Sequence, residues 1–114
     1  MTTASSESAT CSMMFFTSSI RGVDLATGKL GETPERQAEL CFENTKTLME
    51  TAGMSMDDIG HMFVWYKDHA FRDAVNGPWV KYFPNMEDRP ARHAIKAELP
   101  GEMAIQLEIV AVGR

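Results

Sequence analysis

Apolar residues recur at helical spacing in one long stretch of the chain. The stretch begins at Thr33-Pro34 and ends at Ala52, and Gly53 follows it. Threonine is a favoured N-cap, proline fits the first helical turn, and glycine commonly terminates a helix. The pattern therefore predicts a helix from Pro34 to about Ala52 with one apolar face for a core.

Three other segments predict strands. The short apolar run at 12–18 predicts the first, and a loop should follow it at 19–32. The segment 59–66 is too short for a typical helix and rich in aromatic and branched residues, which predicts a strand buried on both faces. The segment 104–112 alternates, which predicts a strand with one face under the helices. Its inward set is Ile105, Leu107, Ile109 and Ala111, and its outward set is Gln106, Glu108 and Val110.

A second helix is expected after Asp68, which can cap a helix that starts near Ala70. Gly77-Pro78 interrupts this segment, so we expect a kink or a restart at Pro78 that carries Trp79 onto the sheet. A short strand should follow Arg89-Pro90. The Leu99-Pro100-Gly101 turn then predicts that this strand and the last one form a closing hairpin.

The order of elements predicts an α+β sandwich with helices on one face of a sheet. The length of 114 residues corresponds to one domain, which we place at 12–114 after a variable lead-in at 1–11.

The composition narrows the classes of function. The formal net charge is −5, which argues against nucleic acid or an anionic membrane as a main partner. No apolar run reaches the ~20 residues of a membrane span, and the first residues lack the pattern of a signal peptide. Cys11 and Cys41 do not have the spacing of metal ligands, and Cys41 falls at an apolar helix position typical of core cysteines. We therefore expect a cytoplasmic protein without a metal or an organic cofactor.

Short landmark motifs follow one another from about Phe15 to Arg114. They are Phe16-Thr17-Ser18, Asn44-Thr45, Ala52-Gly53-Met54, Asp57-Asp58-Ile59, Val64 to Asp68, Phe71 with Val75-Asn76, Arg89-Pro90-Ala91-Arg92, Leu99-Pro100 and the final strand. In this order and spacing, the motifs resemble the Rid family (YjgF-type reactive intermediate deaminases).

The resemblance implies a fold, an assembly and a reaction. The fold is a chorismate-mutase-like sandwich with a mixed sheet and two helices on one face. The assembly is a homotrimer whose sheets form a central barrel, with ligand clefts between subunits. The reaction is hydrolysis of enamine or imine acids, such as 2-aminoacrylate and 2-iminopropanoate, to 2-oxo acids and ammonia.

The resemblance also assigns roles to individual residues. Arg92 falls on the family's carboxylate-binding arginine, and a guanidinium matches the two oxygens of a carboxylate. Ser18 and Asn76 fall on positions lining the same cleft, Trp79 on an aromatic position, and Ala94 on a position whose main chain touches the ligand. Three of these residues have a structural alternative: a local backbone partner for Ser18, a helix cap for Asn76 and core packing for Trp79.

The chain departs from the family at several positions. Deaminating members carry two glutamates in the last strand, where this chain has Gln106 and Glu108, and the missing glutamate is the one that holds the attacking water. An amide positions water but accepts no proton at neutral pH. Glu108 and His93 are possible auxiliary groups, although strand alternation should turn His93 away from Arg92. The family's N-terminal Gly-Pro-Tyr segment, which supplies a pocket tyrosine, has no counterpart in residues 1–11.

These departures leave three functions open. The first is imine hydrolysis with Arg92 and Gln106 as the catalytic pair. The second is non-catalytic binding of a small carboxylate such as a 2-oxo acid, which the glutamine favours. The third is deamination of a larger enamine of the 2-aminomuconate type.

Overall fold

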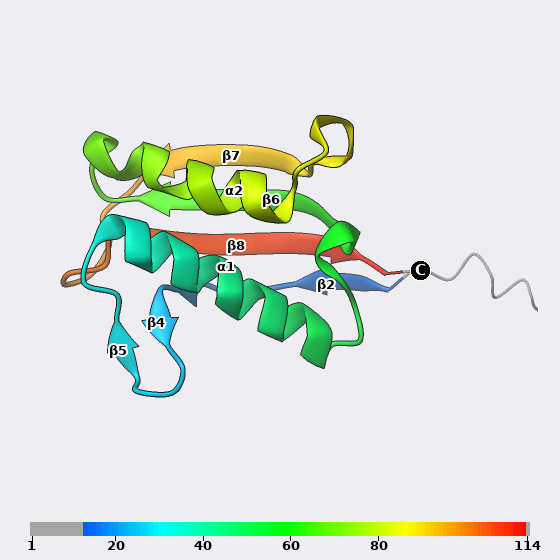
Figure 1. The fold of residues 1–114 in the computed structure, drawn as a ribbon, viewed down its shortest axis with the longest axis horizontal. Coiled ribbons are helices and arrows are strands. Elements are labelled where there is room, and N and C mark those ends of the chain that lie inside the picture. Colours follow the sequence, from blue (N-terminus) through cyan, green and yellow to red (C-terminus); the bar gives the residue numbers. More distant parts are fainter. Residues whose placement is uncertain (1–12, 114) are drawn as a thin grey trace, which may run out of the picture.

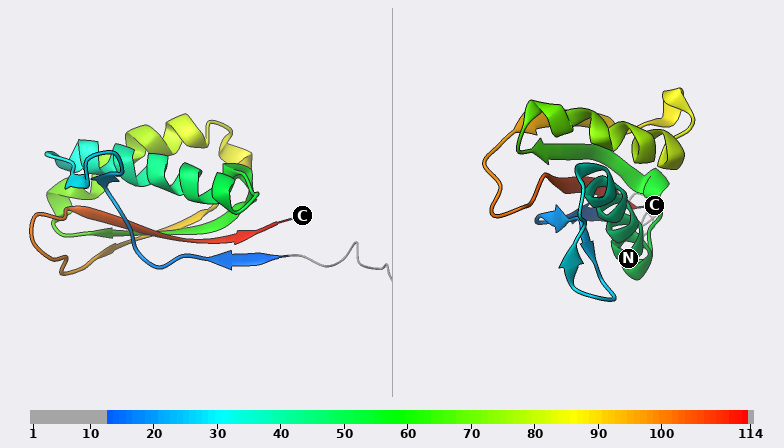
Figure 2. Two further views of the ribbon diagram at one scale, coloured as in Figure 1. Left: turned by 90° about the horizontal axis from the view of Figure 1, so that it is seen from below. Right: turned by 60° about the vertical axis from the view of Figure 1, so that its left-hand side comes forward.

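The computed structural model describes residues 13–113, in which two layers pack together. One layer is a mixed β-sheet and the other contains the helices α1 and α2, which cover the same face of that sheet (Figures 1 and 2). The predicted lead-in at 1–11 lies outside the described residues. The predicted α+β architecture with helices on one face is confirmed. The strands are β2 (Met14–Phe16), β3 (Ile20–Arg21), β4 (Val23–Asp24), β5 (Lys29–Leu30), β6 (Ile59–Tyr66), β7 (Ala91–Lys96) and β8 (Ile105–Val112), and the helices are α1 (Pro34–Thr51) and α2 (Asn76–Tyr82).

The main sheet has the order β2-β8-β6-β7, and β3 also pairs with β8. The pairs β6–β8, β2–β8 and β3–β8 are antiparallel, and β6–β7 is parallel. The predicted closing hairpin is therefore wrong, because β6 lies between β7 and β8. A parallel pair needs a long crossover, which α2 and its flanking turns provide. The turn at Leu99-Pro100-Gly101 spans the end of β6 rather than joining two paired strands.

The segment predicted as a loop contains three short strands. Strand β3 adds to the main sheet, while β4 and β5 form a separate two-stranded hairpin. The side-chain amide of Asn44 on α1 donates to the carbonyls of Arg21 (3.0 Å) and Val23 (2.8 Å), which fixes this segment against the helix. The prediction failed here because these strands are two residues long and too short to show alternation.

The first helix follows its prediction. The Thr33 hydroxyl accepts a hydrogen bond from the Arg36 backbone N–H at 3.0 Å, Pro34 occupies the first turn, and Gly53 follows the helix with φ of 76°. An L-residue at Gly53 would be strained, so this glycine sets the helix end.

The second helical segment is split, as expected, although the restart comes earlier than Pro78. A 3₁₀ helix runs from His69 to Val75, and the Asp68 side chain accepts from the Ala70 N–H at 2.9 Å. Helix α2 then begins at Asn76, so Pro78 lies in its first turn, where a missing N–H removes no helical hydrogen bond.

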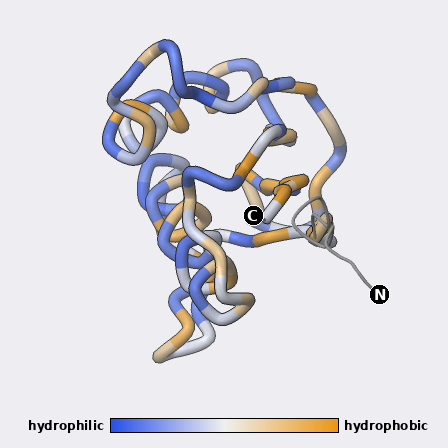
Figure 3. The backbone as a smooth tube through the Cα atoms, turned by 90° about the vertical axis from the view of Figure 1, so that its right-hand side faces the viewer, coloured by the Kyte–Doolittle hydropathy of each residue, from blue (hydrophilic) through white to orange (hydrophobic). Residues whose placement is uncertain are grey.

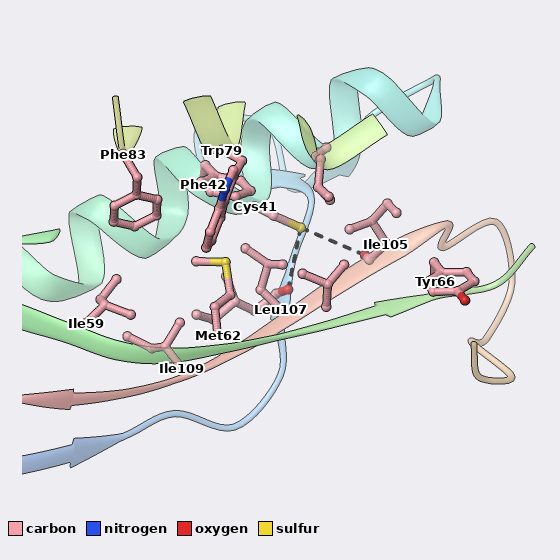
Figure 4. Close-up of a cluster of buried hydrophobic side chains, with 14 of the residues drawn as sticks. Cys41, Phe42, Ile59, Met62, Tyr66, Trp79, Phe83, Ile105, Leu107 and Ile109 are labelled. Atoms are coloured by element: carbon pink, nitrogen blue, oxygen red, sulfur yellow. Dashed lines mark hydrogen bonds between the residues drawn. The ribbon is translucent and has the colours of Figure 1, made fainter. Parts of the chain in front are cut away.

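The core lies between the helices and the covered sheet face (Figure 4). The inward set of β8 is almost fully buried, as predicted, and Trp79 and Phe83 of the α2 segment join it. Cys41 is a core residue, as predicted: its Sγ lies 3.6 Å from the Ile20 carbonyl and 3.8 Å from that of Ile105. Figure 3, viewed roughly along the strands, shows hydrophobic (orange) segments in the middle of the molecule near the C-terminus.

Strand β6 is not buried on both faces in the single chain. Met62, Val64 and Tyr66 are buried, while the intervening residues are half-buried. We call the uncovered side of the sheet the open face; the described helices all lie on the other side (Figure 2). Following the strand registers, the open face contains Met14, Phe16, Arg21, His61, Phe63, Trp65, His93, Ile95, Gln106, Glu108, Val110 and Val112.

Candidate functional site

Arg92 lies on β7 and points to the helix-covered side of the sheet. Its register partner on β6 is the buried Met62, and its Nη1 donates to the side-chain oxygen of Asn76 at 3.2 Å. The guanidinium carbon lies 4.9 Å from the centre of the Trp79 ring. The guanidinium is half-buried and forms no ion pair with a carboxylate of residues 13–113. Asn76 accepts one of the N–H donors of this guanidinium, so the other N–H groups are available to bind an anion.

The charges around Arg92 favour a negative ligand. Burial and then the neighbouring Arg72 lower the pKa of Arg92, and Arg89 adds to this, while Asp73 opposes it. Arg92 stays charged at neutral pH regardless, because an arginine pKa lies far above 7. Three guanidiniums near one acid produce a local positive potential in a chain of net charge −5. Arg89 is itself fixed by donating from Nε to the Phe83 carbonyl at 2.7 Å.

Helix α2 holds the groups that orient Arg92. Trp79 is buried and packs on Phe83 with ring centres 5.0 Å apart. The Arg92 guanidinium lies over its indole ring. Asn76 begins the helix, and its side-chain nitrogen lies 3.5 Å from an Asp73 oxygen. Trp79 thus packs in the core, as its structural alternative predicts, and it also contacts the Arg92 guanidinium through a cation–π interaction.

The main chain at Ala94 faces outward at the edge of the sheet. The Ala97 N–H donates to the Tyr66 carbonyl at 2.9 Å, so it points toward β6. Backbone groups of a strand alternate in direction, and therefore the N–H and C=O of Ala94 point away from β6. The structure thus places Arg92, Asn76, Trp79 and the Ala94 main chain at one edge, the β7 edge, with guanidinium and amide donors for a carboxylate.

Gln106 and Glu108 lie on the other face of the same sheet. Gln106 pairs with Trp65 of β6, three residues further along than the Met62 beside Arg92. With two strand spacings between β7 and β8, the Cα atoms of Arg92 and Gln106 are roughly 14 Å apart, and their side chains point to opposite faces. One copy of the chain does not bring the two proposed catalytic residues together.

Ser18 lies at the opposite sheet edge from Arg92, between β2 and β3. It lines a cavity of about 490 Å³ between the β2–β3 connection and α1, together with Phe15, Asn44 and Leu48 among others. That cavity does not reach Arg92. Ser18 is exposed and lies in the connection between β2 and β3, both of which pair with β8, the strand of Gln106. The predicted residues therefore form two groups, one at the β7 edge and one near the β2–β3 edge.

His93 turns away from Arg92, as strand alternation predicts. Its ring centre is 5.1 Å from that of His61 and 6.0 Å from that of Phe63, which places it on the open face. The His61 Nε2 and Trp65 Nε1 atoms are buried and have no hydrogen-bond partner among the described residues. His93 therefore belongs with the open face rather than with the β7 edge.

Arg21 is a residue near Gln106 that the sequence did not single out. It is the antiparallel partner of Gln106 in the β3–β8 pair, so the two side chains share the open face with Cβ atoms about 5 Å apart. The signal was hidden because β3 spans only two residues and its register is not visible in the sequence.

Residues 13–113 hold no group of three or more His, Cys, Asp or Glu side chains placed to bind a metal ion. In the same range, no helix is both long enough and apolar enough to cross a membrane. Burial raises the pKa of the Cys41 thiol to about 12, which makes it a poor nucleophile at neutral pH.

The fold and the β7 edge define a small α+β protein with an arginine poised for an anionic ligand, and comparison with known proteins identifies its family. The profile of Endoribonuclease L-PSP (Ribonuc_L-PSP) matches residues 2–113. The chain belongs to this family, which confirms the resemblance to Rid proteins.

Individual relatives support this membership. A 2-iminobutanoate/2-iminopropanoate deaminase of Salmonella typhimurium is 34% identical over 103 residues, covering 89% of this chain and 80% of the relative. The crystal structure of RidA from Psychrobacter has a TM-score of 0.78 at 30% identity, covering 86% and 79% of the two chains. The structure of Escherichia coli TdcF with bound serine has a TM-score of 0.80 at 29% identity, covering 89% and 81%.

Proposed function

We propose that this protein hydrolyses small enamine or imine acids to 2-oxo acids and ammonia, in clefts formed between copies of the chain. The observation that carries the proposal is the half-buried Arg92, held by Asn76 and Trp79, with no carboxylate of residues 13–113 paired to it. The similarity to a deaminase of 2-imino acids supports the reaction class. A structural relative with bound serine supports a small carboxylate as the type of ligand.

In this mechanism Arg92 binds the substrate carboxylate through both oxygens, and the Ala94 N–H completes the anion site. The imine carbon then faces a water molecule, whose oxygen forms the new C–O bond. Both hydrogens of that water pass to the imine nitrogen, the C=O bond forms as the C–N bond breaks, and ammonia leaves with a 2-oxo acid as the other product. Positioning and charge stabilisation accelerate a reaction that proceeds readily without a strong base.

Gln106 holds the water from a neighbouring copy, because within one chain it lies on the opposite sheet face from Arg92. A homotrimer whose sheets form a barrel meets this requirement, since it places the β7 edge of one copy beside the β3 edge of the next. The open face supports such an assembly: it exposes Met14, Phe16 and Val112, and two of its buried polar atoms have no hydrogen-bond partner among residues 13–113. Exposed apolar patches of this kind mark association surfaces.

Binding without catalysis is the second candidate, and the amide of Gln106 favours it. A glutamine keeps the hydrogen bonds of a glutamate but removes the proton acceptor. Glu108 is two residues further along the same face and is the nearest acid on that strand.

The test couples the protein to an amino-acid dehydratase that releases the enamine and follows the appearance of the 2-oxo acid. We expect the wild-type protein to accelerate this step, Arg92→Ala to lose at least about 100-fold of the acceleration, and Gln106→Glu to increase it. Arg36→Ala is the matched control, because Arg36 is an exposed, ion-paired arginine on α1. Equal rates for wild type and Arg92→Ala would reject catalysis, and tight binding of 2-oxobutyrate without turnover would favour the second candidate.

A further inference from the structure

Arg21 and Gln106 form a cross-strand pair on the open face, at the edge of the sheet opposite Arg92. Directly paired residues on antiparallel strands share a face, and their side chains contact each other or the same ligand. The Cβ atoms of Arg21 and of Gln106, whose amide is proposed to hold the water, therefore lie about 5 Å apart. In the proposed assembly, Arg21 supplies a second cation from the copy that does not contribute Arg92.

The local structure fixes the backbone of Arg21 firmly. Ile20, the preceding residue, is buried in the core and pairs with Leu107, so alternation turns Arg21 outward. The Asn44 amide holds the Arg21 carbonyl at 3.0 Å from the helix side. The direction of the Arg21 side chain thus follows from a buried neighbour and an anchored main chain.

The charge of Arg21 is not neutralised by the described part of the chain. Its partner Gln106 is neutral, and no carboxylate within residues 13–113 forms an ion pair with it. Glu108 shares the face, but it is two residues further along β8 and is diagonal to Arg21. An unpaired guanidinium beside the reacting end of a ligand provides a bidentate site for a second anionic group.

We infer that the preferred substrate carries a second carboxylate, as an enamine or imine of a dicarboxylic acid does. Arg92 binds the carboxylate next to the imine carbon, and Arg21 of the neighbouring copy binds the distal one. This inference rests on the proposed function, since it needs the β7 edge of one copy beside the β3 edge of the next. It assigns Arg21 as a specificity-determining residue of the same site.

The test measures binding of two 2-oxo acids to the full chain by calorimetry. One probe is 2-oxobutyrate, with one carboxylate, and the other is 2-oxoglutarate, with two. We expect wild type to bind 2-oxoglutarate at least about 10-fold more tightly, because a charge-assisted bidentate pair is added. Arg21→Gln should lose that preference and keep its affinity for 2-oxobutyrate within about twofold.

Two further variants make the result specific. Arg21→Lys should retain part of the preference, because it keeps the charge without the planar fork. Lys29→Gln on β5 removes one positive charge outside the proposed site and should retain the full preference. Equal wild-type affinities for the two acids, or equal weakening of both by Arg21→Gln, would overturn the inference.

The same titrations separate this inference from the proposed function. If 2-oxobutyrate binds and Arg92→Ala abolishes that binding, while no preference for 2-oxoglutarate exists, the proposed function stands and the role of Arg21 is rejected. If neither acid binds to wild type, or binding ignores Arg92, both are rejected.

Discussion

The two faces of the main sheet use the same strands and differ in how completely the single chain covers them. Under α1 and α2, the inward residues of β6 and β8 are almost fully buried and pack on Phe42 and Trp79 (Figure 4). On the open face, aromatic and histidine rings pack on one another, with His61 and Phe63 4.4 Å apart, yet remain half-exposed. One face therefore stabilises the subunit, and the other is suited to contact between subunits.

The largest expected effect is on assembly and comes from a charge on the open face. Phe63→Glu places a carboxylate where the proposed homotrimer excludes water, which costs about 2 kcal/mol or more in each of the three copies and so exceeds the effects below when summed. We expect light scattering at a subunit concentration of about 10 μM to show a trimer for wild type and a monomer for Phe63→Glu.

Leu25→Glu is the control for that experiment. Leu25 is 68% exposed on the turn between β4 and β5, which projects away from the main sheet (Figure 1). It should remain trimeric. A trimeric Phe63→Glu, or a monomeric wild type, would show that the open face is not the association surface.

The next effect is on stability and comes from the covered face. Phe42 is fully buried and its ring stacks on Tyr82 with centres 5.7 Å apart. Phe42→Ala should lower the free energy of unfolding by about 3–5 kcal/mol, through lost burial and a cavity. Urea unfolding at a fixed subunit concentration measures this. Leu25→Ala should change it by less than about 0.5 kcal/mol, and a similar loss in both variants would contradict the assignment of the core.

The smallest effect is a pH dependence of the free energy of unfolding, which reports whether water reaches the Cys41 thiol under the helices. Burial raises the pKa of Cys41 from its ordinary value of 9.0 to about 12. Below pH 9 the thiol is protonated in both states, so its full contribution is present. Between pH 9 and about 12 only the unfolded chain releases the proton, and the free energy of unfolding falls by about 1.4 kcal/mol per pH unit.

The measurement compares wild type with Cys41→Ala by urea unfolding at about pH 8, below the range in which this linkage acts, and at about pH 9.5 and 10.5, within it. Contributions from other titrating groups cancel in the difference between the two proteins. The stability advantage of wild type should shrink along this series. A constant difference would mean that water reaches the Cys41 thiol in the folded protein.

The sequence predicted those parts of the fold whose signals are local. The cap at Thr33, the end at Gly53 and the alternation of β8 are each determined by neighbouring residues, and the structure confirms all three. The position of β7 was mispredicted because its pairing partner is β6, some thirty residues earlier. Strand order depends on such distant contacts, which periodicity does not reveal.

For the candidate site, too, some residues could be found from the sequence and others only from the folded chain. Family resemblance pointed to Arg92, Asn76, Trp79 and Ala94, and the structure brings these together at one edge. It also pointed to Ser18 and Gln106, which a single chain keeps apart from Arg92. Arg21 was missed because its importance depends on one register, β3 against β8, that only the folded chain shows.

The central position of β8 has a consequence for biosynthesis. This strand comes after all the other described strands along the chain, yet it lies between β2 and β6 and pairs with β3 as well. Until β8 is synthesised, the backbone groups of β2, β3 and β6 that pair with it lack hydrogen-bond partners. The sheet is therefore completed only after translation has passed residue 112. A nascent chain stalled before that point lacks the central strand of its sheet and exposes unpaired strand edges, the kind of surface that chaperones protect.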